Sequence, residues 1–311
     1  MFWKILTAKY LDVRFKPSKM LDVTIVERPG LWMEKSALAA LINDCQSVAI
    51  SSLPAPLDYG IFAEGSTARE NTIITLIRDR NTGRPIAFNA LPVMQIELGS
   101  ENMEVVHLGL VMVDPNFRGG GLSWILYGLT CLLLFFRRQM RPLWVSSVTQ
   151  VPAVVGMVAE TFDNVWPGQG ATHAPSFAHS HIARQIMRDY RHIFGVGSEA
   201  GFDDKRFIIT NAYTGGSDNL KKSFDTATKH REPQFNDLCR EWLDYDRGDD
   251  VLQVGQLNLA TAQNFLIRSV PNSALPKLIV QLMILGTQAL LAPTIQWLAA
   301  NKSLGNLRAA Q

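Results

Sequence analysis

The sequence predicts a mixed α/β fold, with a twisted, mostly antiparallel sheet flanked by helices and a helical C-terminal extension. Three observations predict it. Apolar, β-branched runs follow one another between residues 71 and 113 with turn sequences between them, which is typical of antiparallel strands. A glycine-rich turn then leads into a long apolar helix. A further strand and helix occupy 143–162, so that helices have a sheet to pack on.

The composition places the chain among globular proteins and excludes several classes. Its 311 residues are 47% hydrophobic and 19% charged, which argues against disorder. A net charge of +2 is too balanced for the concentrated basic face of a nucleic-acid-binding protein. Three widely spaced cysteines form neither a disulfide framework nor a zinc motif. The N-terminus lacks a secretory signal pattern, so a reducing, cytoplasmic setting is expected.

Each element has a local reason. Residues 1–21 mix aromatic and basic residues and are expected to form an N-terminal arm. Turn-forming residues at 79–84 (DRNTGR) separate two strands and predict a hairpin. Helices are expected where apolar residues recur at helical spacing, at 34–50, 122–136, 152–162 and 182–194. Strands are expected at 22–27, 71–78, 85–98, 105–113, 143–149, 206–212 and 251–259.

The chain divides into three parts on this basis. We expect the arm at 1–21, a main domain at 22–230, and a last part at 231–311 with the final strand and an apolar helical extension. The segment 168–180 is expected to be a loop. The charged stretch 231–250 is expected to be a solvated turn, and the alternative is that its acidic residues Asp244, Asp246, Asp249 and Asp250 attract an amine.

The most informative part of the sequence is the stretch from Val105 to Arg138. An apolar strand leads into a turn with one arginine and three consecutive glycines, and an apolar helix follows. Free N–H groups at a helix start, the helix dipole and glycines that allow close approach make such a stretch suited to binding a phosphate. A Walker loop fits less well, because no Lys-Ser or Lys-Thr follows the glycines.

The segment from Val113 to Ser123 reads VDPNFRGGGLS. This segment and the order of elements resemble the GCN5-related N-acetyltransferase (GNAT) superfamily. The signature of that family is Arg or Gln, two residues, Gly, one residue, then Gly or Ala. Here it reads Arg118, Gly121 and Ser123, so the last position departs from the pattern with another small residue.

The resemblance implies an acyl-coenzyme A thioester, acetyl or longer, as co-substrate, and no metal. The pyrophosphate of coenzyme A would be held by the backbone N–H groups of Arg118, Gly119, Gly120, Gly121, Leu122 and Ser123. The backbone of Val111, Met112 and Val113 would bind the pantetheine arm like an added strand. This requires the strand at 105–113 to part from the strand at 143–149.

Two residues are candidates for the chemistry. His107 lies where the family often places a glutamate base, and an imidazole titrates near neutral pH. Strand alternation predicts that residues 107, 109, 111 and 113 share one face. A structural histidine is the competing interpretation. The family's usual acid is a tyrosine on the helix at 152–162, which has none. Polar candidates at the end of the preceding strand are Ser146, Ser147, Thr149 and Gln150, of which we select Ser147; the alternative is that they satisfy backbone groups where the strands part.

Other polar clusters have ordinary interpretations. His173, His179 and His181 form a cluster that would suit a metal only with further ligands at suitable spacing, and none is present. Arg137, Arg138 and Arg141 would suit an acidic acyl carrier protein, although arginines also favour the C-terminal end of a helix.

The segment 274–300 is strongly apolar but interrupted by glutamines and a proline. We expect a helical cap on the body. Two alternatives stay open, a peripheral contact with a membrane surface and part of a channel for a long acyl chain.

The sequence therefore predicts an enzyme that transfers an acyl group from coenzyme A to a small-molecule amine. The alternatives are an N-acyl synthase that uses acyl carrier protein, and a catalytically weak acyl-CoA-binding sensor at a membrane surface. A homodimer stays open, and no nucleic-acid partner is expected.

Overall fold

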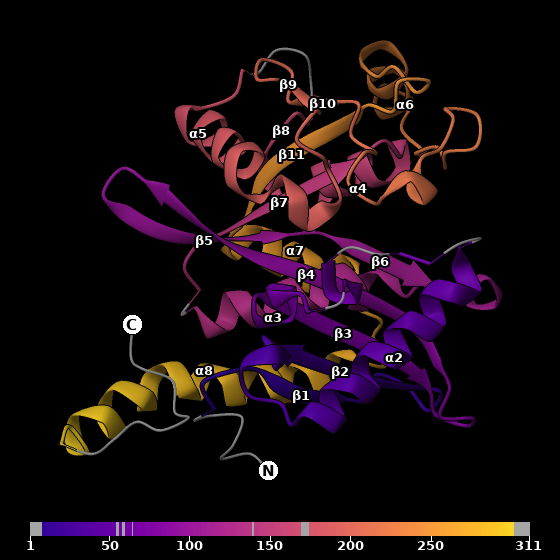
Figure 1. The fold of residues 1–311 in the computed structure, drawn as a ribbon. Coiled ribbons are helices and arrows are strands. Elements are labelled where there is room, and N and C mark those ends of the chain that lie inside the picture. Colours follow the sequence, from indigo (N-terminus) through magenta and orange to yellow (C-terminus); the bar gives the residue numbers. More distant parts are fainter. Residues whose placement is uncertain are drawn as a thin grey trace.

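The computed structural model describes residues 8–53, 56–57, 60–63, 65–138, 140–168 and 174–301. It is a mixed α/β fold in which helices cover both faces of one large, twisted sheet (Figure 1). The predicted fold class is confirmed. The N-terminal strands β1 to β4 form one half of the sheet, and β7 to β11 form the other half with α4, α5 and α6 around it.

The sheet has the strand order β1-β2-β3-β4-β5-β7-β11-β10-β9, with β6 beside β4 and β8 beside β11. All neighbours are antiparallel except β5 and β7, which are parallel. The strands are β1 Asp12–Phe15, β2 Leu21–Glu27, β3 Thr72–Asp79, β4 Pro85–Leu98, β5 Glu101–His107, β6 Leu110–Val113, β7 Leu143–Thr149, β8 Asp163–Trp166, β9 Gly201–Asp203, β10 Ile208–Thr210 and β11 Asp250–Leu257.

The described part of the chain contains seven α-helices around this sheet. They are α2 Lys35–Ser52, α3 Thr130–Arg137, α4 Pro152–Thr161, α5 Phe177–Gln185, α6 Pro233–Trp242, α7 Leu259–Arg268 and α8 Leu275–Leu298. A π-helical segment, η5 (Trp124–Leu129), precedes α3, so the apolar helix predicted at 122–136 begins with widened turns. The loop expected at 168–180 is shorter than predicted, because α5 begins at Phe177.

Alternation along β4 shows how the core is divided. Phe88 packs in the cluster beneath α2, and Met94 packs in the cluster beneath α5, so these two helices lie on one face of the sheet. Leu91 and Val93 point the other way, into the cluster that includes α3 and α8. Side chains of odd and even number on a strand face opposite sides, so β4 joins both layers.

The strand predicted at 105–113 is interrupted. Val93 pairs with Val106, whereas Ala90 pairs with Leu110, so two residues of β4 lie opposite three residues of the partner. This is a β-bulge, and it inverts the side-chain alternation beyond it. Gly109 lies inside the bulge, where an added Cβ would lie 2.6 Å from the carbonyl oxygen of Ala90. Only glycine allows this close approach.

Both ends of the chain contribute strands. In the arm, β1 pairs with β2 at the edge of the sheet. Near the other end, β11 lies between β7 and β10. The prediction of a solvated turn at 231–250 is wrong, because Phe235 and Cys239 of α6 are buried against α4 and Asp250 begins the buried strand β11.

The apolar helix α8 packs on α3 through Leu278 and Leu282, which are buried in the core. The predicted helical cap therefore agrees with the structure. Its other face exposes Val280, Met283 and Trp297. No helix among the described residues has the length and apolar character needed to span a membrane. The contact with a membrane surface stays a prediction.

Candidate functional site

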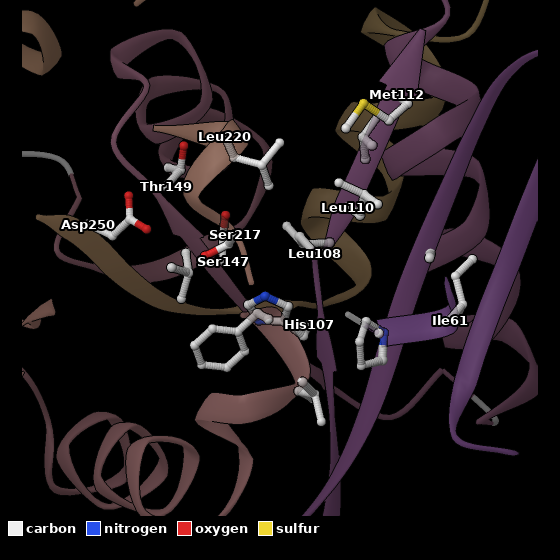
Figure 2. A pocket seen from close by; sticks show the side chains of 18 of the residues that line it. Ile61, His107, Leu108, Leu110, Met112, Ser147, Thr149, Ser217, Leu220 and Asp250 are labelled. Carbon is white, nitrogen blue, oxygen red and sulfur yellow. The ribbon is translucent and has the colours of Figure 1, made fainter. Parts of the chain in front are cut away.

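The sheet opens between β6 and β7. The parallel pairing of β5 with β7 extends only from Val105 to His107, and the last link is the N–H of Leu108 donating to the carbonyl of Ser146 at 2.6 Å. Beyond this point β6 pairs with β4 and β7 pairs with β11. A cavity of about 1340 Å³ occupies the opening (Figure 2). The predicted parting of the two strands is confirmed.

The predicted pantetheine-binding residues lie along this opening. Val111, Met112 and Val113 line the cavity on β6, which pairs with β4 and has no second strand partner among the described residues. A strand with one partner leaves N–H and C=O groups on its other edge available to an extended ligand. The four residues of β6 span roughly 13 Å. The edge leads from the bulge towards the glycine turn.

The glycine turn is shaped by its glycines. Asp114 accepts a hydrogen bond from the N–H of Asn116 at 2.9 Å and pairs with Arg84, which fixes the start of the turn. Gly119 and Gly121 have positive φ angles of 78° and 66°, and an added Cβ at either would meet nothing within 4 Å. These glycines are therefore required for backbone conformation, and the space above them is open.

The same turn leaves donors at the start of the helix. The N–H groups of Gly119, Gly121 and Leu122 have no acceptor among the described residues. Arg118 and Ser123 line the cavity. The residues predicted to hold a pyrophosphate are thus gathered at one end of the opening, with backbone donors and partial positive charge from the helix start.

A tyrosine that the sequence analysis missed lines the cavity from the same helix. Tyr127 lies four residues after Ser123, and both side chains line the cavity. Burial raises the pKa of the Tyr127 phenol, so it stays protonated at neutral pH. The helix at 152–162 has no tyrosine, but the cavity has one from the helix before it. The predicted apolar helix contained Tyr127, yet its sequence does not show which side faces the opening.

His107 stands where β5 and β7 part. The bulge places it on the same sheet face as Leu110 and Met112, so the prediction that residues 107, 109, 111 and 113 share a face is wrong. Its Nδ1 lies 3.0 Å from Ser146 Oγ, and its ring stacks on Phe194 at 4.8 Å between centroids.

Burial lowers the pKa of His107 to about 3. The imidazole is therefore neutral at working pH, and a role of His107 as general base stays a prediction. A neutral imidazole held by Ser146 and Phe194 can still orient a substrate or accept a hydrogen bond.

Ser147 points to the other sheet face from Ser146, because adjacent residues on a strand alternate. It is buried, lines the cavity and pairs with Gln253 across the sheet. The two candidate catalytic residues therefore reach the opening from opposite faces of the sheet. The sequence placed both near the parting strands but did not show this division.

The wall formed by β7 and β11 is polar. Figure 2 shows Ser147, Thr149, Ser217 and Asp250 on this side of the cavity, with Leu110, Met112 and Ile61 on the opposite side. The carboxyl group of Asp250 is buried and accepts a hydrogen bond from Tyr213 at 2.9 Å. Burial, reinforced by neighbouring Asp249 and opposed by Tyr213, raises the pKa of Asp250 to about 7.

The predicted histidine cluster contacts protein atoms. The ring of His179 is bound by Ser176 and by the carbonyl of Asn164, and His181 by the carbonyl of Glu97. His173 lies outside the described residues. Within the described part of the chain, no three His, Cys, Asp or Glu side chains gather as a metal ion requires.

The arginine cluster does not form one surface. Arg137 is buried and binds Glu27 and the carbonyls of Ala8 and Lys9. Arg138 pairs with Glu104, which leaves Arg141 exposed. The idea that three arginines form a docking site for an acidic carrier protein is therefore wrong.

Comparison with known proteins adds limited similarity. No family profile and no curated protein matches the chain. A solved structure of ribosomal-protein-S5-alanine acetyltransferase from Vibrio fischeri aligns with 14% identity over 43% of this chain and 74% of that chain, at a TM-score of 0.30. An acetyltransferase from Trypanosoma brucei aligns with 20% identity over 36% and 72%, at a TM-score of 0.21. A mutant protein from Bacillus halodurans aligns with 12% identity over 35% and 71%, at a TM-score of 0.20.

The order of elements is the one that the resemblance to GNAT enzymes predicts: strand, helix, hairpin, strand, glycine turn, helix, strand and helix.

Proposed function

We propose that this protein transfers an acyl group from a coenzyme A thioester to an amine. The observation that carries the proposal is the opening between β6 and β7, which has a glycine turn with free N–H donors at one end and buried polar side chains at the other. Such an opening suits a long, narrow donor that presents phosphates at one end and a thioester at the other.

The donor would lie along β6. The N–H groups of the turn from Arg118 to Ser123 would bind the pyrophosphate, and the free edge of Leu110–Val113 would pair with the amides of the pantetheine arm. The thioester would then lie near Gly109, where the strands part and the bulge interrupts β6.

The chemistry needs alignment of two reactants, proton transfer and stabilisation of negative charge. Tyr127 is protonated and lines the cavity, so it is our candidate for donating a proton or hydrogen bond to the leaving sulfur. Ser147 lies on the sheet face that α3 covers and is the second candidate for this proton donor. His107 is buried and neutral, and we assign it a role in orienting the acceptor.

The cavity has room for more than an acetyl group. Its volume of about 1340 Å³ exceeds the roughly 300–1,000 Å³ of common ligand pockets. None of the described residues that line it comes from α7 or α8. We propose that a longer acyl chain would lie against Ile61, Leu110 and Met112, and the acyl channel that involves residues 274–300 stays an alternative.

Calorimetric titration with coenzyme A tests the donor site. We expect wild-type protein to bind and Gly121→Glu to bind at least tenfold more weakly, because a carboxylate would face the phosphates. Gly99→Glu is the matched control. Both glycines have a φ of 66° with nothing near an added Cβ, but Gly99 lies in the turn after β4. Failure of the wild type to bind would refute the proposal.

Thiol release from acetyl-CoA and a longer acyl-CoA, with a panel of amines, separates an enzyme from a binding protein. Binding without thiol release from any amine would favour the sensor alternative. Transfer only from acyl carrier protein would favour the synthase alternative.

A further inference from the structure

The polar wall contains a carboxylate that has no cationic partner among the described residues. Asp250 is 5% exposed and is the one Asp or Glu among the described residues that line the cavity. Among the titratable groups that act on it or feel its charge are Tyr213, Cys239, Tyr245 and Asp249, and none of these four is a cation. Lys222 also lines the cavity, but its exposed side chain forms no ion pair with Asp250 in the described part of the chain. A buried carboxylate is costly unless it is paired or hydrogen-bonded, so this environment invites a positive charge from outside.

The preceding residue, Asp249, is a buried carboxylate with a structural role. Asp249 is also fully buried, but it pairs with Arg247 at 2.6 Å and accepts from the N–H groups of Asn211 at 3.2 Å and Asp244 at 3.1 Å. Asp249 thus holds its turn together. Asp250 has acceptor capacity left over after its bond with Tyr213, because a carboxylate accepts at about four positions.

A hydrogen-bonded chain fixes the neighbouring amide. Gln150 Nε2 donates to the carbonyl of Leu220 at 3.2 Å and to Tyr213 Oη at 2.6 Å. A carbonyl oxygen only accepts, so the amide nitrogen must face Leu220. Tyr213 Oη consequently accepts from Gln150 and donates its proton to Asp250 at 2.9 Å.

This arrangement leaves a second acceptor. Gln150 is 1% exposed and lines the cavity, and its Oε1 has no hydrogen-bond partner in the described structure. Gln150 and Asp250 are direct neighbours at the ends of β7 and β11, since Thr149 pairs with Val251. Two adjacent groups that only accept are complementary to a group that only donates.

The pair is distant from the point of transfer. His107 is level with Ser146 on β7, and Gln150 lies four residues further along. Four residues of a strand span roughly 13 Å. Ser146 pairs with His107 and with Val254, so His107 shares a sheet face with the even-numbered residues of β11, which include Asp250. Gln150 directly follows β7 and is joined to Asp250 through Tyr213.

We propose that Asp250 and Gln150 bind an ammonium or guanidinium group of the acceptor, separate from the amine that is acylated. The acceptor is thus a small amine with a second cationic group, such as a diaminoalkane. This inference rests on the proposed function, because that function defines the acceptor. The cation-binding site formed by Asp250 and Gln150 does not depend on it.

The test is calorimetric binding to the full chain at pH 8, with 1,5-diaminopentane and pentane-1,5-diol as probes. The second probe has the same length but carries no positive charge. We expect the diamine to bind wild-type protein at least tenfold more tightly. Asp250→Asn should abolish this difference. Asp246→Asn removes the same charge from an exposed residue of the neighbouring turn and should keep it.

Equal affinity of the two probes for the wild type, including no binding of either, would overturn the inference. A difference that survives in Asp250→Asn would also overturn it. Titration of the same preparations with coenzyme A separates the two proposals. Protein that binds coenzyme A but does not distinguish the probes contradicts only this inference. Protein that distinguishes the probes but does not bind coenzyme A contradicts only the proposed function.

Discussion

The two walls of the cavity differ in how they offer contacts. The β6 wall presents apolar side chains, Leu110 and Met112, with a free backbone edge, whereas the β7–β11 wall presents Ser147, Gln150 and Asp250. A backbone edge recognises any extended chain with amides, so it suits a common donor. Buried polar side chains recognise particular charges and shapes. The comparison suggests that acceptor specificity is encoded on the β7–β11 wall.

The two buried titratable groups sharpen this contrast. Burial lowers the pKa of His107 to about 3 and raises the pKa of Asp250 to about 7. The same physical cause, loss of water around the charged form, acts in opposite directions on a base and an acid. The histidine at the end of the opening is thus uncharged, and Asp250 is poised between its charged and neutral forms.

The largest effect is expected from Tyr127→Phe. If the phenol assists departure of the sulfur, kcat should fall by roughly 10²-fold, which is within the usual range for proton transfer by a positioned side chain. The affinity for coenzyme A should stay within about twofold, since the backbone holds the donor. Steady-state kinetics with calorimetry on the same variant measures both. An unchanged kcat would remove Tyr127 from the chemistry.

The next effect concerns stability in acid. The folded pKa of His107, about 3, lies below its ordinary value of 6.5, so the folded state binds fewer protons between these values. Its contribution is complete above pH 6.5 and is lost as the pH falls towards 3, by up to about 4 kcal/mol. His107→Gln should therefore lose less stability than wild type between pH 7 and 4 in urea unfolding. Parallel curves for the two proteins would contradict the assigned pKa.

Asp250→Asn should show the opposite dependence. The folded pKa of Asp250, about 7, lies above its ordinary value of 3.8, so the folded state binds more protons between these values. Asp250 then ionises in the unfolded state while it stays protonated in the folded state. The wild type therefore becomes less stable as the pH rises from about 4 to 7, by a few kcal/mol at most. Relative to wild type, the variant should gain stability over this interval. If the variant instead loses stability relative to wild type over this interval, a positive group inside the protein already pairs with the Asp250 carboxylate.

The smallest effects should separate the two adjacent serines. Ser146→Ala removes the bond to His107 Nδ1 and should cost about 1 kcal/mol of stability, typical of one hydrogen bond. Ser147→Ala has no such partner to lose and should act on transfer instead, by a few-fold in kcat. Urea unfolding and thiol release on both variants would test this. Similar effects of both changes would break the distinction between the two sheet faces at β7.

Much of the fold could be predicted because its signals are local. Alternating apolar residues and turn sequences located β3, β4 and β7 within a few residues, and the three glycines marked the turn before α3. The short strands β1, β8 and β9 were missed, as was α7. Strands of three or four residues have little periodicity, and their pairing stabilises them more than their own sequence does.

The same distinction between local signals and long-range contacts applies to the site. The sequence by itself determined the glycine turn, the strand beside it and the neighbourhood of His107, because neighbours in the chain define them. Only the tertiary structure decided which sheet face His107 occupies, since one extra residue at the bulge inverts the alternation. It also decided that Tyr127 faces the opening and that Asp250 is buried. The charged run around Asp250 suggests solvent, but β11 lies between β7 and β10, and this long-range pairing removes water from its carboxylate.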